Sequence, residues 1–175
     1  MTGPPPTVVV TDANVLINLM HVARLDLYAG LPGLEFVIPD HVREEITVPG
    51  QRTALDAAVA QGLFRIAAIT EPADIAFFAD LKGYLGRGEA ACLVLAVRNG
   101  WSIASDEKGR FRREAAERIG AERLVGTVDL YILAIRAGLL SIEEADADKV
   151  VLELHRFRMP FGSFREVVEP GREGP

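Results

Sequence analysis

The stretch VVVTDANVLINLM, residues 8–20, sets the architecture of the chain. Its first four residues are β-branched and predict a strand. From Asn14 onward apolar side chains recur at helical spacing, so the strand passes directly into a helix. Asp12 therefore lies at the carboxyl end of the first strand, where an open parallel sheet collects its ligands.

The same order of strand and helix recurs along the chain. Further strands are predicted at 35–39, 63–69, 101–105 and 124–127. Helices are predicted to continue over 25–31, to start near 40, and to cover 53–60, 72–85, 89–98, 111–119, 129–137 and 142–157. Alternating strands and helices predict an α/β protein with a parallel sheet covered on both faces. The segment 89–98 is almost wholly apolar and is expected deep in the core.

Length and composition indicate one compact domain. The 175 residues are 49% hydrophobic and 25% charged, and no apolar run approaches the length of a membrane-spanning helix. We expect one domain over 8–168, disordered ends at 1–7 and 169–175, and a cytoplasmic protein. The single cysteine, Cys92, excludes an internal disulfide, and the net charge of −6 argues against a general nucleic-acid-coating protein.

Acidic residues stand where this architecture collects ligands. Asp12 and Asp106 each follow a predicted strand, and Glu89 begins the buried helix that precedes the second of these strands. The helix near residue 40 offers Glu44 and Glu45, of which we choose Glu45 as the fourth catalytic acid. We expect Asp12, Glu89 and Asp106 to be the metal ligands among the four.

Carboxylates held close together repel one another and require cations or protons. Mg²⁺ or Mn²⁺ is the expected partner, because these ions prefer carboxylate and water oxygens. The three histidines, His21, His41 and His155, are scattered and form no zinc-type set. Such ions can activate a water and stabilise the charge that develops on a phosphate, so phosphodiester hydrolysis is the predicted chemistry.

Each of these residues has a simpler alternative. Asp12, Glu89 and Asp106 could each only cap a helix, and Asp129 could do the same. Glu44, Glu45 and Glu107 could be solvated surface charges. A basic group beyond Asp106 could hold RNA phosphates or form a solvated helix face. Its members are Lys108, Arg110, Arg112 and Arg113. The arginines and phenylalanines of segment 156–165 could contact RNA or pack across a dimer interface, and packing is favoured.

The motifs TDAN at 11–14, REEI at 43–46, GEA at 88–90 and SDEK at 105–108 resemble the acidic positions of the PIN-domain nucleases over about residues 8–168. Within this family the chain resembles the branch related to the toxins of bacterial VapBC toxin–antitoxin pairs, through segments 106–110 and 126–130. This resemblance implies a three-layer α/β/α fold, an Mg²⁺- or Mn²⁺-dependent endoribonuclease, an antitoxin partner and a homodimer. It also adds Asn14 and Asp129 as polar positions near the site. Glu89 and Ser105 depart from the toxin pattern, which more often has Asp and Thr there.

The leading hypothesis is therefore an endoribonuclease that acts as the toxin of such a pair. An alternative is a PIN-like module that binds RNA or protein without turnover. A magnesium-dependent phosphatase on a related fold is a third possibility, but such enzymes need a second Asp where this chain has Asn14.

Overall fold

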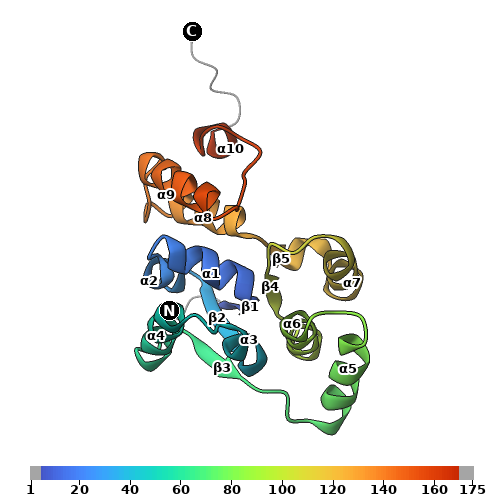
Figure 1. Cartoon of the computed structure of the whole chain (residues 1–175). Coiled ribbons are helices and arrows are strands. Elements are labelled where there is room, and N and C mark those ends of the chain that lie inside the picture. Colours follow the sequence, from blue (N-terminus) through green and yellow to red (C-terminus); the bar gives the residue numbers. More distant parts are fainter. Residues whose placement is uncertain (1–4, 170–175) are drawn as a thin grey trace.

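A computed structural model describes residues 5–169, and the expectations for 1–4 and 170–175 lie outside this range. Five parallel strands form one sheet in the order β3-β2-β1-β4-β5 (Figure 1). The strands are β1 (Thr7–Thr11), β2 (Leu34–Pro39), β3 (Arg65–Ala67), β4 (Ser102–Ala104) and β5 (Leu124–Val125). The predicted α/β/α sandwich around a parallel sheet is confirmed.

Helices cover both faces of this sheet (Figure 1). One face carries α1 (Ala13–His21), α2 (Leu25–Ala29), α4 (Pro49–Ala60), α8 (Thr127–Arg136) and α9 (Ile142–Leu154). The other face carries α5 (Pro72–Lys82), α6 (Arg87–Asn99) and α7 (Gly109–Ile119). The short helix α3 (Asp40–Glu45) follows β2 and contacts both α1 and α6, and α10 (Arg165–Val168) packs on α8.

The order in which the chain adds strands to the sheet reverses at β1. Val10 pairs with Val37 of β2 on one side and with Ile103 of β4 on the other. The chain first winds from β1 toward β3 and later from β4 toward β5, so β1 and β4 flank a topological switch point. In such sheets the crevice at the carboxyl ends of the two central strands is where ligands bind.

The core is built on the sheet and on α6. Residues 90–96 of α6 are all buried, which confirms the expectation from their apolar sequence. Cys92 is fully buried among them, and this burial raises the pKa of its thiol well above the ordinary value. No helix within residues 5–169 is long and apolar enough to cross a membrane.

Polar contacts attach α9 to the first half of the chain. The Arg24 guanidinium pairs with the Asp148 carboxylate at 2.9 Å, and the Tyr131 hydroxyl donates to the same carboxylate at 3.1 Å. The imidazole rings of His21 and His155 stack with their centroids 3.6 Å apart. These contacts pack the C-terminal helices against the helices that cover the sheet.

Three predicted boundaries are wrong. The first helix does not continue into 25–31, because Ala23 adopts a left-handed backbone with φ of 54° and separates α1 from α2. The helix predicted over 142–157 ends at Leu154, with Arg156 at a φ of 67° just beyond it. Thr127 does not end a strand but begins α8.

Candidate active site

Asp12 lies at the carboxyl end of β1 and caps α1, as the sequence predicts. Its Oδ1 accepts a hydrogen bond from the Ala13 N–H at 2.8 Å, and its Oδ2 accepts one from the Ser105 hydroxyl at 3.0 Å. The residue is only 4% exposed. Burial raises the pKa of Asp12 to about 6, and the charges of Glu45 and Glu107 add to this effect, while the two hydrogen bonds oppose it. A bound cation would offset the cost of keeping the Asp12 carboxylate charged in this buried position. The environment of Asp12 therefore suits metal binding in addition to helix capping.

The amino end of α6 holds two further carboxylates. The Gly88 N–H donates to Glu45 Oε1 at 2.8 Å, and the Gly86 N–H donates to Glu89 Oε2 at 2.7 Å. The partial positive charge of a helix amino terminus stabilises both acids at this position. A Cβ atom at residue 88 would lie 2.6 Å from Glu45 Oε2, so a larger residue here would displace the Glu45 carboxylate from its present position.

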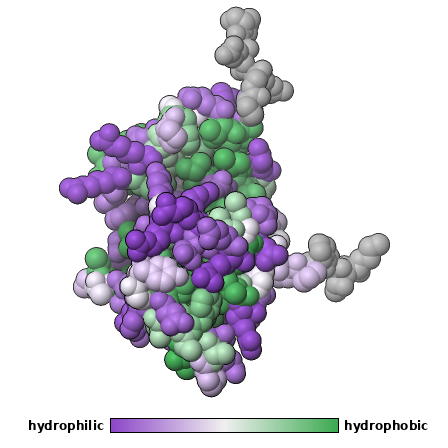
Figure 2. Space-filling view, turned by 90° about the vertical axis from the view of Figure 1, so that its right-hand side faces the viewer, coloured by the Kyte–Doolittle hydropathy of each residue, from purple (hydrophilic) through white to green (hydrophobic). Residues whose placement is uncertain are grey.

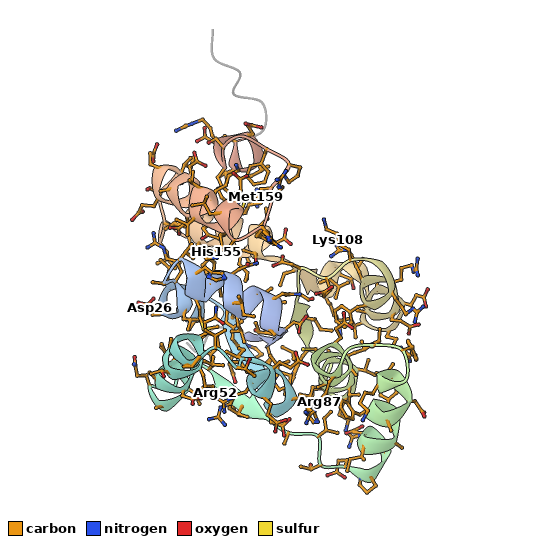
Figure 3. All side chains as sticks on the ribbon, in the orientation of Figure 1. Asp26, Arg52, Arg87, Lys108, His155 and Met159 are labelled. Atoms are coloured by element: carbon orange, nitrogen blue, oxygen red, sulfur yellow. The ribbon has the colours of Figure 1, made fainter. Side chains whose placement is uncertain are left out.

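Glu44 and Glu45, which the sequence left as neighbouring candidates, point to different partners. Glu44 forms an ion pair with Arg87 at 2.7 Å, on the surface between α3 and α6. Figure 3 labels Arg87 there. Glu45 instead turns to the amide of Gly88 and lines the same pocket as Asp12.

Asn14 and Ser105 tie the loop after β4 to Asp12. The Asn14 amide donates to Asp12 Oδ2 at 3.2 Å and to Glu107 Oε1 at 3.0 Å, and its oxygen accepts from the Asp106 N–H at 3.1 Å. The Ser105 hydroxyl, which donates to Asp12, accepts from the Glu107 N–H at 3.2 Å. These bonds hold the Glu107 carboxylate on the same side as Asp12.

The Asp106 carboxylate faces away from Asp12. It accepts hydrogen bonds from the backbone N–H of Thr127 at 2.7 Å, from the Thr127 hydroxyl, and from the Asn18 amide at 3.0 Å. Burial raises the pKa of Asp106 above its ordinary value, and these bonds counteract the shift. The side chain is thus anchored to the first turn of α8.

The result is one acidic pocket at the carboxyl ends of β1 and β4, with a volume of about 280 Å³. Its polar side chains are Asp12, Asn14, Glu45, Glu89 and Glu107. Asp106 lines the neighbouring cavity instead. Within residues 5–169, no three acidic, histidine or cysteine side chains lie close enough together to form a ready metal-binding group.

The basic residues predicted to bind RNA separate in the structure. Lys108 and Arg112 line the cavity next to the acidic pocket, together with Asp129. Asp129 also caps α8, because its Oδ2 accepts from the Gly126 N–H at 2.7 Å. Arg110 donates to the Tyr84 carbonyl, and Arg113 lines neither cavity. Figure 2 shows that hydrophilic side chains gather across the middle of this side of the molecule, with hydrophobic ones above and below.

Three residues that organise the site are not among the residues predicted from the sequence. Asn18 lies one helical turn after Asn14 on α1, and this spacing could have revealed it. The sequence predicts Thr127 at the end of a strand, and from that position its hydrogen bond to Asp106 is not expected. Gly88 is the second glycine of the GRG segment at 86–88, and its missing side chain allows the close approach of Glu45.

The doubly wound parallel sheet, with an acidic pocket at its switch point, defines an α/β protein whose chemistry depends on carboxylates. A family model described as a PIN domain matches residues 8–168, so the chain belongs to the PIN-domain family. PIN domains are generally nucleases, which supports a nuclease-type function. The closer likeness to VapC toxins stays a prediction, and a search of curated proteins found no match.

Proposed function

We propose that this protein is a divalent-metal-dependent endoribonuclease that hydrolyses RNA phosphodiester bonds in its acidic pocket. The observation that carries the proposal is the convergence of four carboxylates, Asp12, Glu45, Glu89 and Glu107, on one pocket at the switch point of a PIN-domain fold. A pocket with this charge attracts cations rather than an unaccompanied phosphate.

The chemical type of the pocket's donor atoms suits Mg²⁺ or Mn²⁺. All four side chains offer hard carboxylate oxygens, which these ions prefer, and the raised pKa of Asp12 reflects a penalty that a bound cation would remove. Because no three carboxylates form a ready group among residues 5–169, binding requires side-chain rotation, for which the exposed Glu45 and Glu107 have room. When bound, such an ion activates a water and stabilises charge on the phosphate.

The position of the Glu107 side chain favours Glu107 over Asp106 as a metal ligand. It lines the acidic pocket, whereas the Asp106 carboxylate is occupied by Thr127 and Asn18. We therefore assign metal binding to Asp12, Glu45, Glu89 and Glu107, and assign to Asp106 the positioning of the loop that carries Glu107. Asn14 and Ser105 complete this positioning through their hydrogen bonds.

Cleavage of a labelled single-stranded RNA by the purified full-length protein tests the proposal. We expect cleavage with MnCl2 or MgCl2, none with EDTA, and a loss of at least about 100-fold in rate for Asp12→Asn. Asp80→Asn is the matched control, because Asp80 is exposed on α5, away from the pocket. Equal rates for wild type and Asp12→Asn, or cleavage in EDTA, would overturn the proposal.

We propose further that this activity is that of a cytoplasmic VapBC-type toxin, a homodimer whose pocket an antitoxin protein occupies. The support is the resemblance of segments 106–110 and 126–130 to such toxins. Expression in bacterial cells should arrest growth for the wild type and not for Asp12→Asn, and light scattering should give a dimer mass. Normal growth with an active, expressed enzyme would contradict the toxin role.

A further inference from the structure

A second cavity, of about 380 Å³, lies on the other side of Glu107 from the acidic pocket. It is formed by the start of α7, the start of α8 and the segment 157–160 that follows α9. Glu107 lines both cavities, so the two cavities adjoin at this residue. In Figure 3, Lys108 and Met159 mark the two parts of the molecule that approach each other here.

Three cations surround this second cavity. They are Lys108, Arg112 and Arg158. All three are exposed, and within residues 5–169 none of them forms an ion pair with an acidic side chain. Many other arginines are paired, as Arg87 is with Glu44 and Arg118 is with Glu114. Unpaired cations around one cavity of a protein with a net charge of −6 are suited to an anionic ligand.

The acidic residues of the same cavity are largely occupied. The Asp106 carboxylate accepts from Thr127 and Asn18, and one oxygen of Asp129 accepts from the Gly126 amide. The third acid, Glu107, accepts from the Asn14 amide and also lines the acidic pocket. The three cations therefore remain the charges available for a ligand of this cavity.

An aromatic ring completes the cavity. Phe157 is half-buried and lines it next to Arg158. Both residues reach this position through a turn that ends α9, in which the Phe157 N–H donates to the Leu152 carbonyl at 2.9 Å and Arg156 adopts a φ of 67°. Glycine usually occupies such a position, and the backbone of another residue is strained there. Strain of this kind is commonly retained at functional sites.

We propose that this second cavity seats a nucleotide of single-stranded RNA next to the bond that is cleaved. Lys108, Arg112 and Arg158 bind its phosphates, and Phe157 stacks on its base. The proposal rests on the proposed ribonuclease function, because the neighbouring acidic pocket receives the scissile phosphate. Phosphate contacts from cations and stacking on an aromatic ring are the two interactions with which proteins bind unpaired nucleic acid.

RNA binding in EDTA tests this subsite without cleavage. Fluorescence anisotropy of a labelled single-stranded RNA, with the full-length protein at several salt concentrations, gives the Kd and its salt dependence. We expect Lys108→Ala, Arg112→Ala and Arg158→Ala each to reduce the slope of log Kd against log salt by about 0.7. Arg136→Ala is the matched control, because Arg136 is exposed at the far end of α8 and should leave the slope unchanged.

The ring of Phe157 gives a different expected result. Phe157→Leu should weaken binding by roughly 5- to 150-fold without changing the salt slope, whereas Phe157→Trp should retain affinity. Urea unfolding of both variants checks that they fold. A Phe157→Leu variant that folds and binds as the wild type does would overturn the subsite.

The remaining outcomes test the proposed RNA subsite and the proposed nuclease activity independently of each other. Cation variants that behave like Arg136→Ala, or a wild type that binds no RNA, would overturn the subsite even if cleavage is observed. The expected binding effects without any cleavage in MnCl2 would support the subsite and refute the nuclease. A larger effect of the variants on DNA of the same sequence than on RNA would overturn the RNA assignment.

Discussion

Replacing Asp12 by asparagine should stabilise the metal-free protein at pH 8. Burial raises the pKa of Asp12 from its ordinary value of 3.8 to about 6, so the folded state holds the proton more tightly than the unfolded state. The contribution of this group to stability is therefore fully present below pH 3.8 and is lost as the pH rises through about 6. A neutral amide does not carry this penalty at pH 8.

The magnitude follows from the pKa and from the hydrogen bonds. The difference between 3.8 and about 6 corresponds to about 3 kcal/mol of unfolding free energy, at about 1.4 kcal/mol for each pKa unit. The asparagine oxygen can still accept from the Ala13 N–H, but its NH2 group replaces the oxygen that accepts from the Asn14 amide and the Ser105 hydroxyl. Losing these two bonds costs about 1–2 kcal/mol. The net gain expected for Asp12→Asn is about 1–2 kcal/mol at pH 8.

Urea unfolding in EDTA at pH 8 and at pH 5 measures this effect. The advantage of Asp12→Asn should fall toward zero at pH 5, because the wild-type carboxyl then takes up a proton in the folded state. Asp80→Asn, an exposed control, should show no difference at either pH. A variant less stable than the wild type at pH 8, or an advantage independent of pH, would refute the reasoning.

Three further substitutions test the contacts around the pocket. Gly88→Ala should displace Glu45, because the added Cβ would lie 2.6 Å from its Oε2, and cleavage should fall by about 100-fold. Thr127→Val should lower the unfolding free energy by about 1–3 kcal/mol at pH 8, because the Asp106 carboxylate loses a hydroxyl donor. Arg156→Gly should raise it by about 1 kcal/mol, because glycine adopts a φ of 67° without strain.

Each of these substitutions has a control in the chain. Gly50→Ala, in a helix with open space around it, should raise the unfolding free energy by about 0.5–1 kcal/mol and leave cleavage unchanged. Thr127→Ser keeps a hydroxyl and Arg156→Lys keeps the strain, so both should match the wild type within about 0.5 kcal/mol. Controls that match the test variants would show that the contacts named above are not the cause.

The order of the elements was predictable because each strand and helix carries its own periodicity. The β-branched run at 8–11 and the apolar segment at 89–98 indicate a central strand and a buried helix without tertiary information. The boundaries near Ala23 and Arg156 were not predictable, because both residues adopt positive φ values that neither side chain favours. Such backbone is fixed by packing of the whole domain rather than by local preference.

The sequence predicts which strand ends carry acidic residues, but not which acidic side chains face the pocket. Asp12 follows from topology alone, since the carboxyl ends of parallel strands meet, and Glu89 follows from its place at the start of the helix that leads into the next central strand. Which of two adjacent acids faces the pocket depends on donors distant in sequence. Glu45 turns toward the amide of Gly88, and Asp106 turns toward Thr127, leaving Glu107 beside Asp12. No local pattern contains these contacts.

Anomalous diffraction from crystals of the full-length protein soaked in MnCl2 shows directly whether the acidic pocket binds a metal ion. We expect a manganese peak in this pocket, bound by Asp12 and by carboxylate oxygens from Glu45, Glu89 or Glu107. We also expect the loss of this peak in Asp12→Asn crystals. A pocket without a peak, or a peak held by Asp106 and Asp129 in the neighbouring cavity, would contradict metal binding by the acidic pocket.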